Sequence, residues 1–182
     1  MTETSQALKT LLDAAPTGSK TYALMDCALE STTIYPTIQS SGCPSRCLFT
    51  QSWQVDLADV APYLVELDPK TQFSAELLTW DWYANWGCFV QSTASLDDCA
   101  QAFTAVTTAQ LPDGTEAFFR FQDPRVLRVF FETASKDDLA AVFGKAMRLV
   151  VPMEDDGHST EGAIVYTLEN GTLKQSASRF DG

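Results

Sequence analysis

Four ionic side chains interrupt an otherwise aromatic and aliphatic run, FFRFQDPRVLRVFF, at residues 118–131. They belong to Arg120, Asp123, Arg125 and Arg128. A carboxylate has about four acceptor sites, so Asp123 has the capacity to cap a helix and to receive an arginine fork at the same time. The pattern indicates ion pairing, which serves either to brace the fold or to anchor a partner protein, and the two roles are compatible.

The five cysteines and the single histidine give little support to other chemistry. Tetrahedral zinc needs four ligands, usually in closely spaced pairs, and Cys43 with Cys47 is the one such pair in the sequence. A cysteine nucleophile needs a histidine beside it, and His158 lies in the acidic stretch 154–162. Glycine-rich phosphate loops and GxSxG elbows are absent from the sequence. We therefore expect no catalytic residue, metal or cofactor, and a protein that is not an enzyme.

The overall composition narrows the classes of partner. The 182 residues fit one domain, and 24 acidic against 12 basic residues give a formal charge of −12. Such a charge repels phosphate backbones and anionic lipid, so nucleic acid and membranes are not expected partners. The N-terminus has no basic, apolar leader pattern, and no apolar run reaches the length of a membrane span. We expect a cytoplasmic protein with reduced thiols.

The ionic run divides into a strand and a helix. The pattern over residues 116–122 predicts a strand, with Phe119 and Phe121 on one face. The same alternation places Arg120 and Gln122 on the opposite face, away from the deeper apolar layer.

The helix is expected to begin directly after this strand. Asp123 is a typical helix cap, and Pro124 suits the first helical position. Val126, Val129 and Phe130 then form the apolar stripe of the helix. We expect the ionic side chains to converge at the corner where the strand meets the helix.

A second candidate surface is the aromatic stretch at residues 72–86, which has a helical pattern closed by Gly87. Trp82 and Trp86 are four residues apart, so they lie on the same face of that helix. Such clusters are usually core. The alternative is a platform for an apolar segment of a partner, because tryptophan is frequent at interface hot spots.

Strands and helices alternate along most of the chain, which predicts an α/β fold with a mixed sheet of about five or six strands flanked by helices. The expected helices cover residues 5–14, 72–86, 96–109, 124–134 and 136–143. The expected strands cover 21–28, 46–50, 61–67, 88–92, 116–122 and 146–153, and Asn170-Gly171 predicts a C-terminal β-hairpin over 163–177. We assign residues 1–153 to the main domain, and 154–182 to a linker and a hairpin packed on it.

The ionic run also resembles the signature of a known family. FRFQDPRVLRVFF, preceded in order by YALMDCA, APYLVEL, NWGCFVQS and PDG and followed by FGKAMRLVVP, is similar to the bacterial type VI secretion effector chaperones, also called adaptors, over about residues 20–152. The family-typical positions are Trp86, Gly87, Arg120, Asp123, Pro124, Arg125 and Val126. The sequence departs from the family at Ala102–Ala105, where members have His-Leu-Arg, and at Gln122, where an aromatic is usual.

The resemblance implies a non-catalytic role. Members of this family bind one toxic effector in the cytoplasm, keep it soluble, and help to load it onto the spike-tip protein. Our candidate partner-binding residues are Arg120, Asp123, Arg125, Arg128, Trp82 and Trp86. Two other hypotheses remain: an immunity protein, whose acidity would suit the basic surface of a toxic nuclease, and, less favoured, a thiol enzyme.

Overall fold

The computed structural model describes residues 2–50, 56–111, 113–153 and 162–180. Its α-helices are α1 (Glu3–Asp13), α2 (Ile34–Ser40), α4 (Gln72–Leu77), α5 (Leu96–Thr104), α6 (Pro124–Thr133) and α7 (Lys136–Phe143), and its 3-10 helices are η1 (Ala58–Val60) and η2 (Trp82–Ala84). Its strands are β1 (Lys20–Asp26), β2 (Ser45–Cys47), β3 (Pro62–Glu66), β4 (Gly87–Ser92), β5 (Thr108–Gln110), β6 (Glu116–Phe118), β7 (Arg148–Pro152), β8 (Gly162–Glu169) and β9 (Thr172–Arg179).

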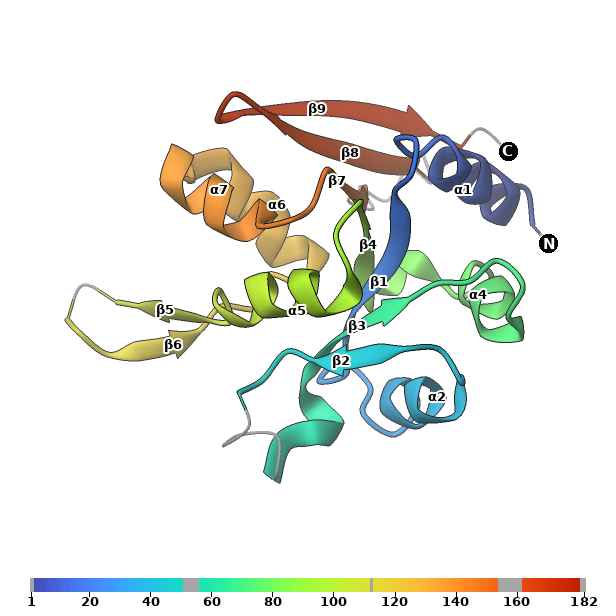
Figure 1. Cartoon of the computed structure of the whole chain (residues 1–182), viewed down its shortest axis with the longest axis horizontal. Coiled ribbons are helices and arrows are strands. Elements are labelled where there is room, and N and C mark those ends of the chain that lie inside the picture. The colour runs from blue at the N-terminus through green and yellow to red at the C-terminus, as the bar shows by residue number, and fades with distance from the viewer. Residues whose placement is uncertain (1, 51–55, 112, 154–161, 181–182) are drawn as a thin grey trace.

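The centre of the molecule is one sheet, in the order β2-β3-β1-β4-β7-β8-β9 (Figure 1). This confirms the predicted α/β class. Within the described residues the sheet has seven strands, more than the sequence predicts, and all its pairings are antiparallel rather than mixed. The predicted hairpin is confirmed as β8–β9, and β8 pairs with β7, so the hairpin continues the main sheet.

Both faces of the sheet are covered by helices, which explains why β1 and β4 are apolar almost throughout. On one face, Ala23 and Met25 of β1 pack in a cluster with residues of α1, α2 and α4. On the other face, Tyr22 and Leu24 pack in a second cluster with residues of α5, α6 and α7. Alternate side chains of the same strand thus pack into two separate cores.

The helices on the second face begin where the sequence predicts. Asp123 caps α6 with Pro124 directly after it, and the Ser95 side chain accepts a hydrogen bond from the N–H of Asp98 at the start of α5. Ser135 caps α7 in a reciprocal capping box with Asp138. These local signals depend on a few neighbouring residues, which makes them readable from sequence.

The helix predicted over residues 72–86 is confirmed only in its first part. It ends at Leu77, and a short 3-10 turn containing Trp82 follows later. Tertiary packing overrides the helical pattern, because the rings of Trp82 and Trp86 lie 5.5 and 5.7 Å from the ring of Phe89 on β4. The backbone of Asn85 has a φ of 60°, in the left-handed region, so an α-helix cannot continue through this residue to Trp86.

The predicted strand 116–122 and helix 96–109 are both longer than the observed elements. The helix ends at Thr104, and Thr108–Gln110 forms β5 instead, paired with β6 in a separate two-stranded ribbon. Strand β6 ends at Phe118. Figure 1 shows this ribbon extending away from the sheet and its helices.

Candidate functional site: an ionic corner beside an apolar recess

The corner begins with Asp123, whose side chain is only 5% exposed. Its Oδ1 accepts hydrogen bonds from the N–H of Arg125 at 2.9 Å and from Nε of the same residue at 3.0 Å, and its Oδ2 accepts one from Nη2 at 2.7 Å. The carboxylate therefore caps α6 and receives an arginine fork, as the sequence predicts. The other edge of the Arg125 side chain is open to solvent, because 56% of the side chain is exposed.

The charge of Asp123 is stabilised by its surroundings. Burial by itself raises the pKa of this carboxyl, but the hydrogen bonds from Arg125 and the positive charges of Arg125 and Arg120 outweigh it, so the pKa lies below its ordinary value. The same carboxylate raises the pKa of the Arg125 guanidinium. Asp123 is therefore ionised at neutral pH.

Arg120 pairs with a carboxylate that the sequence did not identify. Its Nη2 donates to Oδ2 of Asp26 at 2.5 Å, and the Asp26 side chain is 1% exposed. Oδ1 of Asp26 accepts from the N–H of Ala28 at 3.1 Å. The pair joins the end of β1 to the turn before α6, 94 residues away in the sequence. The sequence signal for this pair is a single acidic residue, Asp26, at the end of an apolar strand.

The ionic side chains do not all converge, which corrects the sequence prediction. Arg128 lies farther along α6, and its Nη1 donates to the carbonyl oxygen of Pro152 at the end of β7 at 2.8 Å. The corner consists instead of two neighbouring ion pairs, with Arg128 as a separate tether. The two ion pairs also interact electrostatically, because the charge of Asp26 contributes to the raised pKa of Arg125.

A turn changes the direction of the chain directly before α6. The N–H of Asp123 donates to the carbonyl oxygen of Arg120 at 3.0 Å, so strand alternation stops after β6. Gln122, predicted to lie on the outer face, is therefore 4% exposed. The predicted apolar stripe of α6 is wrong at Val129, which is 65% exposed. Phe130 packs against the core, but the buried residues of the helix are Pro124, Leu127 and Phe131.

Trp82 and Trp86 lie in the core, each 3% exposed. Nε1 of Trp82 donates to the carbonyl oxygen of Gly87 at 3.2 Å, and the rings of Trp80 and Trp86 meet edge to face at 5.8 Å. This geometry favours the core interpretation of the two tryptophans over a surface platform.

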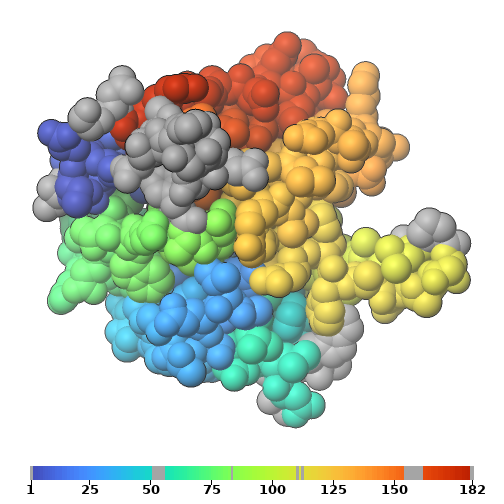
Figure 2. Space-filling view, turned by 180° about the vertical axis from the view of Figure 1, so that it is seen from behind, coloured from blue at the N-terminus to red at the C-terminus, as the bar shows by residue number. Residues whose placement is uncertain are grey.

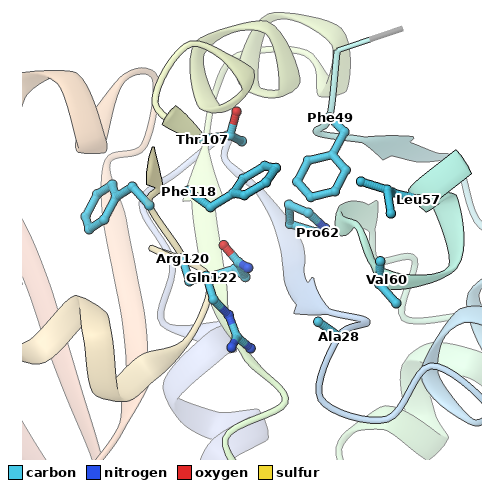
Figure 3. Close-up of a pocket in the computed structure, with 10 residues that line it drawn as sticks. Ala28, Phe49, Leu57, Val60, Pro62, Thr107, Phe118, Arg120 and Gln122 are labelled. Atoms are coloured by element: carbon cyan, nitrogen blue, oxygen red, sulfur yellow. The ribbon is translucent and has the colours of Figure 1, made fainter. Parts of the chain in front are cut away.

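An apolar recess of about 220 Å³ adjoins the corner. Figure 3 shows Phe118 and Gln122 on one side of it and Phe49, Leu57 and Pro62 on the other. The remaining lining residues are Ala28, Val60, Thr107, Phe119 and Arg120. Arg120 thus belongs both to an ion pair and to the wall of the recess. The sequence analysis identified Gln122 as a departure from the family pattern, but it did not place this residue at a recess.

The β5–β6 ribbon forms one border of the recess and projects from the body of the molecule (Figure 2). Phe118 on β6 is 50% exposed, and Leu111 beside β5 is 46% exposed. The ring of Phe118 lies 5.1 Å from that of Phe49, so the ribbon is tied to the body by an aromatic contact. The ribbon therefore presents an exposed apolar surface next to the recess.

Other chemistry finds little support among the described residues. Burial raises the pKa of Cys27 and of Cys88 to about 12, which disfavours the reactive thiolate of both. No group of three or more potential metal ligands occurs in the described ranges, and no helix there is long and apolar enough to cross a membrane. His158 and the predicted linker 154–161 lie outside the described residues.

Comparison with known proteins gives one match. The model of a family described as a domain of unknown function (DUF4123) matches residues 21–141, well over half of the chain. No curated protein and no solved structure matches. The matched range starts in β1 and ends in α7, so it contains both ion pairs, the ribbon and every residue that lines the recess.

Proposed function

We propose, from the premise that this chain belongs to the DUF4123 family of domains of unknown function, that it is an effector chaperone or adaptor of type VI secretion. It binds one effector protein in the cytoplasm and helps to load that effector onto the spike-tip protein. It acts by binding, without catalysis. The signature around Asp123, which is similar to that of known effector chaperones, supports the secretion context.

The observation that carries the proposal is the projecting β5–β6 ribbon with the apolar recess at its base. An isolated two-stranded ribbon is marginally stable by itself, so a partner that covers it would stabilise it. Phe118 and Leu111 offer apolar area of the kind that protein interfaces bury. We infer that the effector packs against the ribbon and the recess.

The ion pairs of the corner hold this surface in shape. Arg120 joins the recess wall to β1 through Asp26, and Asp123 fixes the start of α6. A rigid surface loses less conformational entropy on binding than a mobile one. The exposed edge of Arg125 is available to a charged group of the effector, where charge pairs contribute specificity more than affinity.

The test is co-expression with candidate effectors taken from the genes on either side of the gene for this chain, followed by gel filtration. We expect one peak that contains both proteins in a fixed ratio. Phe118→Ser should reduce the yield of the complex, whereas Val129→Ser, which changes an exposed residue on α6 outside the recess, should not. Two separate peaks from the wild-type pair would contradict the proposal.

A second candidate is an immunity protein that neutralises a toxin directly, which the formal charge of −12 favours. Such a surface would attract a basic nuclease. Cells that make the toxin internally would then survive when this chain is present, with no change in toxin export. Export that depends on the chain, without protection from internal toxin, would favour the adaptor.

A further inference from the structure

The outer edge of β9 is a long strand edge that has no partner strand among the described residues. β9 is the last strand of the sheet and has eight residues, whereas β2 at the opposite edge has three. Its register with β8 is continuous, without a bulge, and it contains no proline. It runs along the border of the molecule (Figure 1). Such an edge is a template for a further strand, because its outer backbone groups are unpaired.

The register fixes which backbone groups of β9 point outward. The carbonyl oxygen of Gly162 accepts from the N–H of Met153, so Gly162 bonds toward β7 and not toward β9. Its partner Arg179 therefore directs its own N–H and C=O away from β8. This direction alternates along an antiparallel strand, so the other outward residues are Leu173, Gln175 and Ala177.

Both ends of this edge are fixed. At one end the Asn170-Gly171 turn closes the hairpin, with φ values of 52° and 72°. At the other end Phe180 is 8% exposed and packs into the core. Six of the eight residues between them are exposed. The strand is therefore held in an extended shape before any partner arrives, which lowers the entropy cost of pairing.

A second copy of the same edge fits it about a two-fold axis. In an antiparallel pair, outward residues lie opposite outward residues, and an axis through Ser176 satisfies this along the whole strand. Ala177 then lies opposite Gln175 of the second copy, and Leu173 lies opposite Arg179 of the second copy. Each such pair exchanges two hydrogen bonds, which gives about eight for the whole contact.

The charges of the edge permit this pairing. Lys174 and Arg179 are the only charged residues of β9, and lysine commonly protects a strand edge. In the two-fold arrangement Lys174 lies opposite Ser178, so neither charge faces a like charge directly. The two copies of Lys174 lie four residues apart along the strands, about 13 Å, which exceeds the Debye length of about 8 Å at physiological salt.

We propose that two copies of this chain associate through β9, about a two-fold axis at Ser176, so that their sheets join into one. The contact lies far from the recess, because Pro62 of β3 lines the recess near the opposite edge of the sheet. Both copies therefore keep the ribbon and the recess open to a partner. A single pair of strands buries less than the about 1,200 Å² of stable interfaces, so the dimer is weak and forms at high protein concentration.

Sedimentation equilibrium of the full-length protein tests the association. We expect a monomer–dimer equilibrium that added salt strengthens, because each copy carries a formal charge of −12. Ala177→Pro removes an outward N–H, and proline is tolerated on an edge strand. This variant should weaken the dimer by about tenfold or more, with an unchanged melting temperature.

Ser176→Cys tests the register. At the axis Ser176 lies opposite its own copy in a non-hydrogen-bonded pair, where the Cα atoms are about 4.5 Å apart, within the range that a disulfide spans. Mild oxidation should therefore cross-link this variant. Ser178→Cys is the matched control on the same face, because its two copies would lie about 13 Å apart and should not cross-link. The wild type gives the background from its natural cysteines, of which only Cys47 is not fully buried.

Three results would overturn the inference. Equal cross-linking of the two cysteine variants would refute the register. A dimer that Ala177→Pro leaves intact would place the contact on another face. A monomer at every concentration would show that a second copy does not bind, and slower exchange of the Leu173 and Gln175 amides in the effector complex would then assign the edge to the effector. The proposed function is tested separately, by formation of the effector complex.

Discussion

Removal of the Arg120 guanidinium by Arg120→Met is the change for which the structure predicts the clearest stability effect. Asp26 is 1% exposed and would keep its bond from the N–H of Ala28, but it would lose its counter-charge. Breaking a fully buried pair in this way costs about 3–5 kcal/mol. Because 44% of the Arg120 side chain is exposed, solvent screens the pair, and we expect a loss of about 2 kcal/mol in the free energy of unfolding.

The reverse change, Asp26→Asn, should cost less. The amide oxygen still accepts from Ala28, and the half-exposed Arg120 is hydrated when its partner loses charge. We expect a loss of about 1 kcal/mol. The double variant should lose only about 1.5 kcal/mol, well below the sum of the two, because neither charge is then left without the other.

The assay is urea unfolding followed by circular dichroism, with midpoints compared at equal slope. The loss for Arg120→Met corresponds to a decrease in melting temperature of about 4–8 °C in a domain of this size. A single-variant loss below about 0.5 kcal/mol, or losses that simply add in the double variant, would refute the idea that this pair braces the corner.

Three further predictions concern single residues. Asp123→Asn keeps a good helix cap but removes the charge. Because the pKa of Asp123 is lowered in the folded state, the wild type should be more stable than the variant at pH 7 in urea unfolding, and this advantage should disappear as the pH falls below 3.8 and through the folded pKa. A difference in stability that stays constant with pH would contradict the lowered pKa. Native Cys27 and Cys88 should react with iodoacetamide at pH 8 about a hundredfold more slowly than in urea, as followed by mass spectrometry, and equal rates would contradict their burial. Gly87→Ala would place a Cβ 2.0 Å from the carbonyl oxygen of Leu24, so we expect a melting temperature far below that of Gly171→Ala, at a turn where the nearest atom lies 3.8 Å away.

The sequence predicted best where structure depends on near neighbours. Asp123-Pro124 marks the start of α6, and Asn170-Gly171 marks the last hairpin, where φ values of 52° and 72° match the left-handed turn that this pair adopts. Both features are set by backbone preferences of two residues. No distant contact is needed to recognise them.

Prediction was poorer where a distant contact decides the outcome. Thr108–Gln110 forms a strand only because β6 pairs with it, so the helical pattern before it was misleading. The partner of Arg120 is Asp26 on β1, which no local spacing reveals. Gln122 was assigned to the outer face because strand alternation was extended past Phe118, where the chain turns. The recess, which joins segments on several elements, had no sequence signal beyond Gln122 itself.

The most direct test of the central claim is hydrogen–deuterium exchange on the purified complex of this chain with its effector, compared with the free chain. If the effector covers the ribbon and the recess, exchange should slow over residues 108–110 and 116–122 and around Ala28, and stay unchanged in α1 and β9. Unchanged exchange in the ribbon, with slowing elsewhere on the molecule, would show that partner binding uses another surface.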